Sequence, residues 1–345
     1  MVNALSAPID VSIELTDKCN LVCVHCFQPE YRQGKLLSTR EIFSLSDELS
    51  NLKVFSIFLS GGEPFLREDW DVIGRYLIDK GFVVGISSNG TLITKNIAKK
   101  LYESQLYKGL QISIDGSCPK IHDSIRGIGS FEKTMQAIKH LDEYDIHPNI
   151  AVTVMNDNIN DIPKIIELAV TNRMRHVHII ALMPGGRAKA AYKKLDPPLD
   201  KWLDMEEKVL KITKKVKNKL TIDWANRRYL PPNKDFTVDN YNDVDKTFTG
   251  CPAGKTKAEI DCYGNVYGCD ILKSTEFLAG NIRSNNFKYI WDNSKVFNQW
   301  RSRTPDKIRG KCERCKWLFA CVGGCPALSM KDNDIFGSDD TCPNM

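Results

Sequence analysis

Short strand-like segments alternate with longer helix-like segments along the first half of this chain, and that alternation restricts its fold more than any other feature. The strand candidates are rich in branched and aromatic residues: 11–15, 55–59, 83–87, 110–114, 150–154 and 177–181. The helix candidates between them carry an apolar residue every three or four positions: 39–52, 69–80, 95–103, 131–144 and 162–171. This order predicts βα units that build a parallel sheet.

The six βα units determine the expected architecture. They are more than an open sheet requires and fewer than the eight of a closed barrel. We therefore expect an α/β fold with a partial (β/α)6 TIM-like barrel. The loops that follow the strands carry the function in such barrels. In this chain those loops hold an early cysteine cluster and the segments 61–64, 88–90, 115–116 and 184–187, although each glycine-containing loop taken alone is also typical of an ordinary turn.

The composition excludes several classes of protein. Hydrophobic residues at 42% and charged residues at 26% are typical of a folded globular chain, and 345 residues allow two or three domains. No apolar run is long enough to span a bilayer, and residues 1–10 lack the features of a secretory signal. The net charge of +5 is too small to indicate nucleic-acid binding. We expect a cytoplasmic protein that binds neither membrane nor nucleic acid.

The rest of the chain divides into two further regions. Residues 199–220 predict a long helix with a lysine-rich solvent face, and residues 226–250 predict a linker or wrapped loop. Residues 251–345 are rich in cysteine and lack regular apolar periodicity. The expected division is a barrel over 1–197, a helical bridge and linker over 198–250, and a domain that folds around metal over 251–345.

Twelve cysteines in a reducing compartment indicate metal binding rather than disulfides. Cys19, Cys23 and Cys26 lie in the loop after the first strand candidate, with His25 between the last two. Structural zinc normally takes four ligands, whereas a cubane iron–sulfur cluster held by three cysteines leaves one iron open. A zinc knuckle with His25 as its fourth ligand is the alternative.

The spacing of Cys19, Cys23 and Cys26 resembles the radical S-adenosylmethionine (radical SAM) superfamily, in which an aromatic residue or histidine precedes the last cysteine. The resemblance implies that SAM chelates the open iron of a 4Fe-4S cluster, and that an electron from the cluster cleaves SAM to give a 5′-deoxyadenosyl radical. The protein would orient this cofactor and exclude water.

Further loops match the same family. Gly61-Gly62-Glu63-Pro64 resembles its GGEP motif, which implies that the backbone and Glu63 contact the methionine ammonium, because glycines permit close approach and a carboxylate pairs with a cation. The resemblance also implies cofactor contacts from Ser88, Asn89, Ser113, Asp115 and Arg126. The alternatives are a surface ion pair for Arg126, a turn at Asn89 and a strand end at Ser113. The remaining histidines are expected to be ordinary imidazoles: His122, His140, His147, His176 and His178.

The C-terminal cysteines resemble the SPASM extension of radical SAM enzymes that act on peptides, and all seven positions of its pattern are matched. The resemblance implies two auxiliary 4Fe-4S clusters, making three in all. Cys251, Cys269 and Cys325 would hold the first, and Cys312, Cys315, Cys321 and Cys342 the second. The first then lacks a fourth ligand, and Cys262, in an expected hairpin around Gly264, is one candidate. A zinc ribbon over 312–325 is the alternative.

Two other residues complete the set of candidates. Asp270 follows Cys269 directly, and the resemblance implies that it is the general base that takes a proton from the substrate radical, although an ordinary surface or capping role is also open. Cys118 matches no ligand pattern and is expected to be a bystander.

The sequence therefore predicts a radical SAM/SPASM oxidoreductase that abstracts hydrogen from a peptide or protein side chain and yields a crosslinked or oxidised product. An enzyme of tetrapyrrole or other cofactor biosynthesis is one alternative, and a non-enzymatic zinc-binding interaction protein is another. The expected electron donor is a flavodoxin or ferredoxin. Because the first strand candidate begins near residue 10, we expect that a separate protein supplies leader recognition or that the substrate is not leader-guided.

Overall fold

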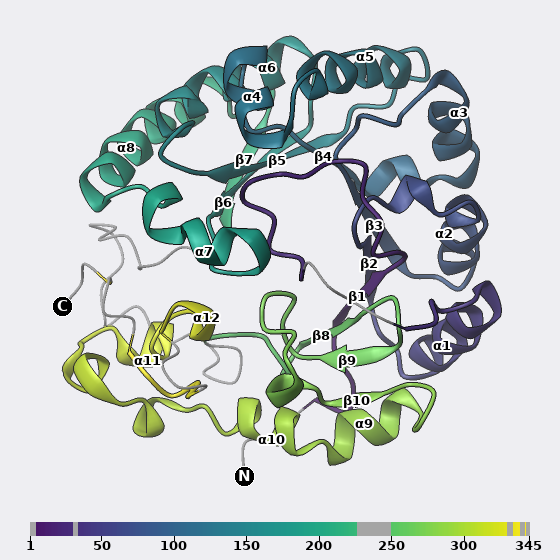
Figure 1. The fold of residues 1–345 in the computed structure, drawn as a ribbon, viewed down its shortest axis with the longest axis vertical. Helices are drawn as coiled ribbons and strands as arrows, with labels where there is room; N and C mark the ends of the chain where they lie inside the picture. The colour runs from purple at the N-terminus through teal and green to yellow at the C-terminus, as the bar shows by residue number, and fades with distance from the viewer. Residues whose placement is uncertain (1–4, 30–33, 226–249, 330–333, 339–341, 343–345) are drawn as a thin grey trace.

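The computed structural model describes residues 5–29, 34–225, 250–329, 334–338 and 342. One curved sheet in this part of the chain joins its strands in the order β10-β9-β8-β1-β2-β3-β4-β5-β6-β7 (Figure 1). The strands are β1 Asp10–Glu14, β2 Ser56–Ser60, β3 Val83–Ser88, β4 Leu110–Ser113, β5 Asn149–Val154, β6 His176–Ala181, β7 Thr221–Ala225, β8 Lys257–Ile260, β9 Asn265–Tyr267 and β10 Gly280–Asn281. The helices are α1 Thr39–Asn51, α2 Trp70–Asp79, α3 Lys95–Ser104, α4 Pro119–Arg126, α5 Ser130–Asp142, α6 Ile162–Thr171, α7 Gly186–Leu195, α8 Leu199–Val216, α9 Phe287–Asn293, α10 Lys295–Arg301, α11 Leu318–Cys321 and α12 Pro326–Ser329.

The sheet is parallel from β1 through β7. Figure 1 shows α1, α2, α3, α5, α6 and α8 on the outer side of its arc. Alternate strand residues such as Ile57 and Leu59 belong to the main hydrophobic core, which these helices share. The predicted partial barrel is therefore confirmed.

Three elements differ from the sequence-based expectation. The lysine-rich helix α8 ends at Val216, and Thr221–Ala225 form the strand β7. Five residues are too few to distinguish such a strand from the adjoining linker by periodicity alone. The short helices α4 and α7 lie in segments that carried no helical prediction. The predicted linker lies outside the described residues, apart from Gly250.

The cysteine-rich C-terminal region continues the sheet of the barrel. Strand β8 pairs in parallel with β1, and β9 returns antiparallel from it, which places a hairpin where one was predicted. The buried side chain of Lys273 joins the two regions, because its ammonium contacts Glu14 on β1 and lies 3.3 Å from Glu259 Oε1 on β8. The two ends of the chain thus form one layer, although no sequence pattern links them. No helix among the described residues combines the length and apolarity needed to cross a membrane.

Candidate functional site

The first three cysteines lie in the loop after β1, which crosses the inside of the arc of strands (Figure 1, purple). The backbone N–H of Cys26 donates to the carbonyl of Cys23 at 3.3 Å, which turns the loop back on itself. Burial raises the pKa of Cys23, and the charges of Cys26 and Cys19 add to this increase. The structure therefore brings the three thiols together, as a shared cluster would require.

The glycines at 61 and 62 hold this loop in place. The N–H of Gly62 donates to the carbonyl of Thr16, and the N–H of Glu63 donates to that of Lys18, both at 2.8 Å. A Cβ atom at Gly62 would lie 2.1 Å from the Lys18 oxygen, and one at Gly61 would lie 2.3 Å from the Thr16 oxygen. The close approach that these glycines permit is to the cysteine loop itself, whereas the sequence argument assigned it to a ligand.

Glu63 is completely buried beneath the same loop. Its carboxylate accepts hydrogen bonds from the Ser88 hydroxyl and the Asn89 backbone N–H, both at 2.8 Å. Burial nevertheless raises the pKa of Glu63 to about 7. The Asn89 side chain reaches back to the loop, donating to Asn20 Oδ1 at 2.9 Å and lying 4.0 Å from Cys19 Sγ. Three predicted cofactor residues therefore meet directly beside the first cysteine.

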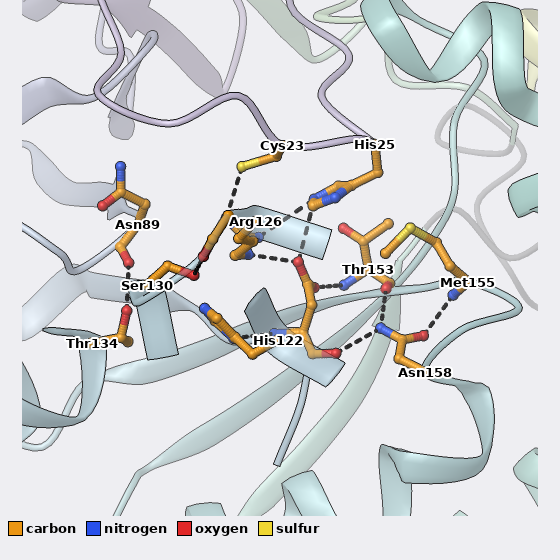
Figure 2. A network of polar contacts seen from close by, with 12 residues as sticks. Cys23, His25, Asn89, His122, Arg126, Ser130, Thr134, Thr153, Met155 and Asn158 are labelled. Atoms are coloured by element: carbon orange, nitrogen blue, oxygen red, sulfur yellow. Dashed lines mark hydrogen bonds and ion pairs between the residues drawn. The ribbon is translucent and has the colours of Figure 1, made fainter. Parts of the chain in front are cut away.

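Asp115 and Arg126 form a buried ion pair, and Figure 2 shows Arg126 beside Cys23 and His25. Arg126 Nε donates to Asp115 Oδ2 at 2.6 Å, and Arg126 Nη1 lies 3.9 Å from Cys23 Sγ. His25 Nε2 is 3.4 Å from the same carboxylate oxygen, and burial lowers the pKa of this imidazole to about 4. The N–H of Thr153 on β5 donates to Asp115 Oδ1 at 2.8 Å. Arg126 is 7% exposed, so the alternative of a surface ion pair is wrong.

Other predicted residues occupy structural positions. Ser113 is half-buried at the end of β4, and Pro64 begins a 3-10 turn after β2. The buried His122 ring accepts a 3.3 Å hydrogen bond from the backbone N–H of Asp115. Cys118 is half-buried and precedes α4. Whether Ser113 contacts a cofactor stays a prediction.

The loop 184–187 after β6 supports the cysteine loop, a role that the sequence analysis did not assign. Gly186 has φ +47°, and a Cβ atom there would lie 2.6 Å from the carbonyl oxygen of Cys26. Arg187 Nε donates to the carbonyl of Cys23 at 3.0 Å. The run Gly185-Gly186-Arg187 after a strand indicates an unusual loop, but the sequence does not show what this loop packs against.

The same loop joins the two ends of the chain. A Cβ atom at Gly185 would lie 3.0 Å from Phe27 Cβ and 3.3 Å from Ile271 Cγ2. Phe27 follows Cys26, and Ile271 follows the candidate base Asp270. The cysteine loop and the segment that carries Asp270 are therefore neighbours.

The C-terminal cysteines fall into two groups. Burial raises the pKa of Cys269, and the charges of Cys251 and Cys325 raise it further, so these three thiols lie near one another. Burial likewise raises the pKa of Cys321, with further contributions from Cys312 and Cys315. The grouping agrees with the two ligand sets that the resemblance implies. Cys342 is half-buried in the described chain, and its place in the second set stays a prediction.

Arg303 lies between these two cysteine groups, and the sequence analysis missed it. Its side chain is 1% exposed, and it interacts electrostatically with Cys251 and Cys325 of one group and Cys321 and Cys312 of the other. Nε donates to the carbonyl of Ile335 at 2.7 Å, but Nη1 and Nη2 have no hydrogen-bond partner among the described residues. A buried cation with idle donors beside two sets of thiols fits anionic clusters in both places.

Cys262 is separated from the first of these groups. It lies in the turn at one end of the β8–β9 hairpin, and Leu37 N–H donates to its carbonyl. Cys251 and Cys269 lie toward the other end, where Gly268 packs against Ala253. Four residues of strand separate the two ends, or about 13 Å. This separation disfavours ligation of the first auxiliary cluster by Cys262, and the assignment stays a prediction.

Asp270 lies beside the first group. Its Oδ1 is 3.7 Å from Cys269 Sγ, and its Oδ2 is 4.0 Å from Lys257 Nζ. Burial raises the pKa of this carboxyl, but the charges of Lys257 and Lys273 outweigh that effect and hold the pKa below its usual value. Asp270 is therefore a carboxylate at neutral pH, and its side chain is 39% exposed. An ionised and accessible carboxylate can accept a proton, and the lowered pKa makes it a weaker base than an ordinary aspartate.

Comparisons with known proteins agree with this geometry. Residues 13–169 match the radical SAM superfamily, and residues 251–316 match the SPASM family, described as an iron–sulfur cluster-binding domain. Mycofactocin maturase MftC of Mycolicibacterium smegmatis is 31% identical, with 94% of this chain and 79% of the maturase aligned. AdoMet-dependent heme synthase of Methanosarcina barkeri is 32% identical, with 94% of this chain and 93% of the synthase aligned.

The fold is also similar to a solved structure. The crystal structure of Streptococcus suis SuiB bound to S-adenosylmethionine superimposes with a TM-score of 0.82 at 19% sequence identity, covering 99% of this chain and 78% of SuiB. That likeness extends over both the barrel and the C-terminal region.

Proposed function

This chain belongs to the radical SAM superfamily and carries a SPASM iron–sulfur domain, and from that premise we propose that it oxidises or crosslinks a peptide or small-protein side chain. The grouping of its thiols around one arc of strands is the observation that carries the proposal. When bound, SAM and its cluster supply a radical that abstracts hydrogen. The chain's own residues bind and orient this cofactor and exclude water.

We propose that the thiols hold three 4Fe-4S clusters. The donor set fits, because each of the three groups consists of cysteine thiols alone, and Arg303 offers idle donors between two of them. Protein reconstituted without oxygen should be brown and contain about twelve iron and twelve sulfide per chain. Colourless protein that binds two or more zinc ions at full occupancy would support the zinc-binding interaction protein instead.

The barrel residues would position SAM beside the first cysteine group. The pKa of Glu63 is about 7, and an ammonium group beside it would lower that pKa and favour the ionised carboxylate. This supports the predicted contact between Glu63 and the methionine amino group. Arg126 Nη1 contacts Cys23 Sγ at 3.9 Å and Nη2 lies 3.5 Å from His25 Nε2, but each of these nitrogens carries a second N–H while Nε stays on Asp115, which supports the predicted contact with the SAM carboxylate. Ser88 and Asn89 hold Glu63 in place.

Asp270 is proposed as the base that takes a proton from the substrate radical as an auxiliary cluster accepts the electron. Its carboxylate is ionised, partly exposed and next to Cys269, and Ile271 places its segment beside the cysteine loop. Hydrogen abstraction and proton removal would then occur at adjoining points of the same face.

A peptide substrate is supported by the relatives. MftC is a maturase, and SuiB has been solved with its precursor peptide SuiA. The similarity to the heme synthase supports a second candidate function, because 93% of that protein aligns with this chain. In that case the substrate would be a tetrapyrrole rather than a peptide, and the proposed clusters would be the same.

The test compares two substrate classes with the anaerobically reconstituted protein. Peptides encoded by short reading frames beside the gene should stimulate 5′-deoxyadenosine formation and change mass, whereas iron tetrapyrroles should do neither. Stimulation by a tetrapyrrole alone would overturn the peptide assignment and leave the radical chemistry intact.

Variants then separate the steps. Cys312→Ala with Cys315→Ala should still form 5′-deoxyadenosine with a strong reductant but give little product, because only auxiliary ligands change. Asp270→Asn should retain all iron and lose about 10²–10⁴-fold in turnover, the usual contribution of a positioned base. The readout is 5′-deoxyadenosine formed per product formed. If that ratio stays constant in both variants, the auxiliary clusters only support the barrel.

A further inference from the structure

Two histidines and an aspartate lie together on the concave face of the sheet. His176 and His178 lie on β6, and Asp223 lies opposite His178 on β7. The alternating residues Val177 and Ile179 are completely buried in the core that the outer helices share. The two imidazoles must therefore project from the other face of β6.

Strand β7 presents its aspartate to the same side. Trp224, the next residue, makes a ring contact with Trp202 of the outer helix α8, with centroids 6.5 Å apart. Asp223 alternates with Trp224 along the strand and so points to the concave face. These residues are separate from the cysteine groups, and the function proposed above assigns them no role.

The three side chains converge on one point. Asp223 Oδ1 is 2.9 Å from His176 Nε2 and also contacts His178 Nδ1. One ligand atom from each residue lies within 4.8 Å of the other two. The side chains of His176, His178 and Asp223 are 25%, 29% and 52% exposed, so water and small ions reach them.

Hydrogen bonding around His176 is compatible with a cation between this imidazole and Asp223. When the Thr221 hydroxyl donates to the carbonyl of Arg175 at 3.1 Å, it accepts the 2.6 Å hydrogen bond from His176 Nδ1. Because a neutral imidazole carries one N–H, this tautomer leaves a lone pair on Nε2. The lone pair then faces the carboxylate oxygen of Asp223 at 2.9 Å, where a metal ion between the two atoms would be favourable. In the other tautomer, Nε2–H donates to Asp223 directly.

We propose that His176 Nε2, His178 Nδ1 and Asp223 bind a divalent metal ion, with Zn²⁺ the preferred ion and water in the fourth position. Two imidazoles and one carboxylate are a donor set that zinc uses in sites with an open position, whereas calcium and magnesium prefer oxygen ligands alone. Thr221 orients His176 through its other nitrogen, as partners of zinc-bound histidines usually do. Tetrahedral bonds of about 2.0–2.1 Å separate ligand atoms by roughly 3.3 Å, so the 2.9 Å contact needs to open by about 0.4 Å and the shorter Asp223–His178 contact by more.

The place of the site on the concave face suggests which class of ligand the open coordination position of the metal would take. His178 lies three residues, or about 10 Å, before the end of β6, and the loop 184–187 that supports the cysteines follows that end. A metal ion there would fasten β7 to β6 and present a Lewis acid on the concave face. The ligand class that it would take is a carboxylate or another anionic oxygen group.

Zinc bound to the reconstituted holoenzyme tests the proposal, because filled iron–sulfur clusters keep the cysteines occupied. Wild-type protein given Zn²⁺ and passed through gel filtration should retain about one zinc per chain. X-ray absorption at the zinc edge should show nitrogen and oxygen neighbours at about 2.0–2.1 Å, including imidazole, and no sulfur at about 2.3 Å. Sulfur neighbours alone, or no retained zinc, would overturn the site.

Matched variants assign the ligands. His176→Gln, His178→Gln and Asp223→Asn should each lower zinc retention at least tenfold while iron content stays at the wild-type value. His147→Ala is the control, because His147 lies 2.9 Å from Asp145 through Nε2 and 3.8 Å from Asp142 through Nδ1, yet among the described residues it belongs to no group of three converging ligand atoms. Zinc retention that is unchanged in the three ligand variants, or lost equally in the control, would contradict the proposal even if the wild-type spectrum shows nitrogen ligands.

Discussion

Arg303 shows how a single residue can serve both auxiliary cysteine groups. Its guanidinium is buried with two idle nitrogens, and the cysteines on each side are its electrostatic neighbours. Replacement by Met removes a cation that stabilises the more negative, reduced form of a cluster. Arg303→Met should therefore lower the midpoint potentials of the auxiliary clusters by about 60–130 mV, if the lost contact is worth about 1.5–3 kcal/mol in a one-electron couple.

A neighbouring arginine provides the control for this prediction. Arg301 is also buried, but its Nε binds the Gly254 carbonyl, its guanidinium lies 4.5 Å from the centre of the Trp291 ring, and its electrostatic neighbour is Asp292 rather than a cysteine. Arg301→Met should leave the potentials unchanged. Redox titration followed by electron paramagnetic resonance measures both variants. Equal shifts in the two would mean that Arg303 acts through folding rather than through its charge.

Glu63 should make stability depend on pH. Its pKa is raised from 4.5 to about 7 by burial. Between these values the unfolded chain loses the proton and the folded chain keeps it, so stability falls as pH rises through this window. The shift corresponds to about 3 kcal/mol. Wild type should therefore lose about that much relative to Glu63→Gln, which does not titrate, between pH 4.5 and 7.5. Anaerobic urea unfolding measures the difference, and a constant difference across the window would show that Glu63 is ionised in the fold.

At the scale of elements, the loop after β6 should be as sensitive as the cysteine motif itself. Gly186 has a positive φ, and a Cβ atom there would meet the carbonyls of Gln28 and Cys26 at 2.3 and 2.6 Å. Gly186→Ala should displace the cysteine loop, lower iron by about one cluster and reduce SAM cleavage at least tenfold. Gly129→Ala is the control, because Gly129 has φ +77° but nothing within 4 Å of its Cβ position. It should cost only the backbone strain of about 1–2 kcal/mol and keep its iron. If the two variants contain equal amounts of iron, the loop after β6 does not support the cysteine loop.

The same element marks the limit of what sequence reasoning reached. The first six strands of the barrel follow from local periodicity, and the cysteine groups follow from the resemblance of their spacing to a known family, because both signals lie within short segments. The support from Gly186 and the pairing of β8 with β1 depend on segments that meet only when the chain folds. Arg303 could not be identified for the same reason: it precedes Cys312 by only nine residues, but nothing in its segment shows that its side chain will be buried between two cysteine groups.

At the scale of the whole molecule, the account joins a radical source at one end of the chain to electron acceptors at the other. Gly185 lies where the two meet, because a Cβ atom at this position would touch both Phe27 beside Cys26 and Ile271 beside Asp270. A single layer of strands runs from β7 to β10 and holds both in a fixed relation. Chemistry at the first cysteine group should therefore be separable from the clusters at the second and third by changing thiols alone.

The most direct measurement is 5′-deoxyadenosine formation by anaerobically reconstituted protein with a strong reductant. Wild type should cleave SAM, whereas the triple variant Cys19→Ala, Cys23→Ala and Cys26→Ala should form none and retain about two thirds of its iron. This result follows because these thiols are the protein ligands expected for the SAM-binding cluster. SAM cleavage that persists in the triple variant would contradict the account.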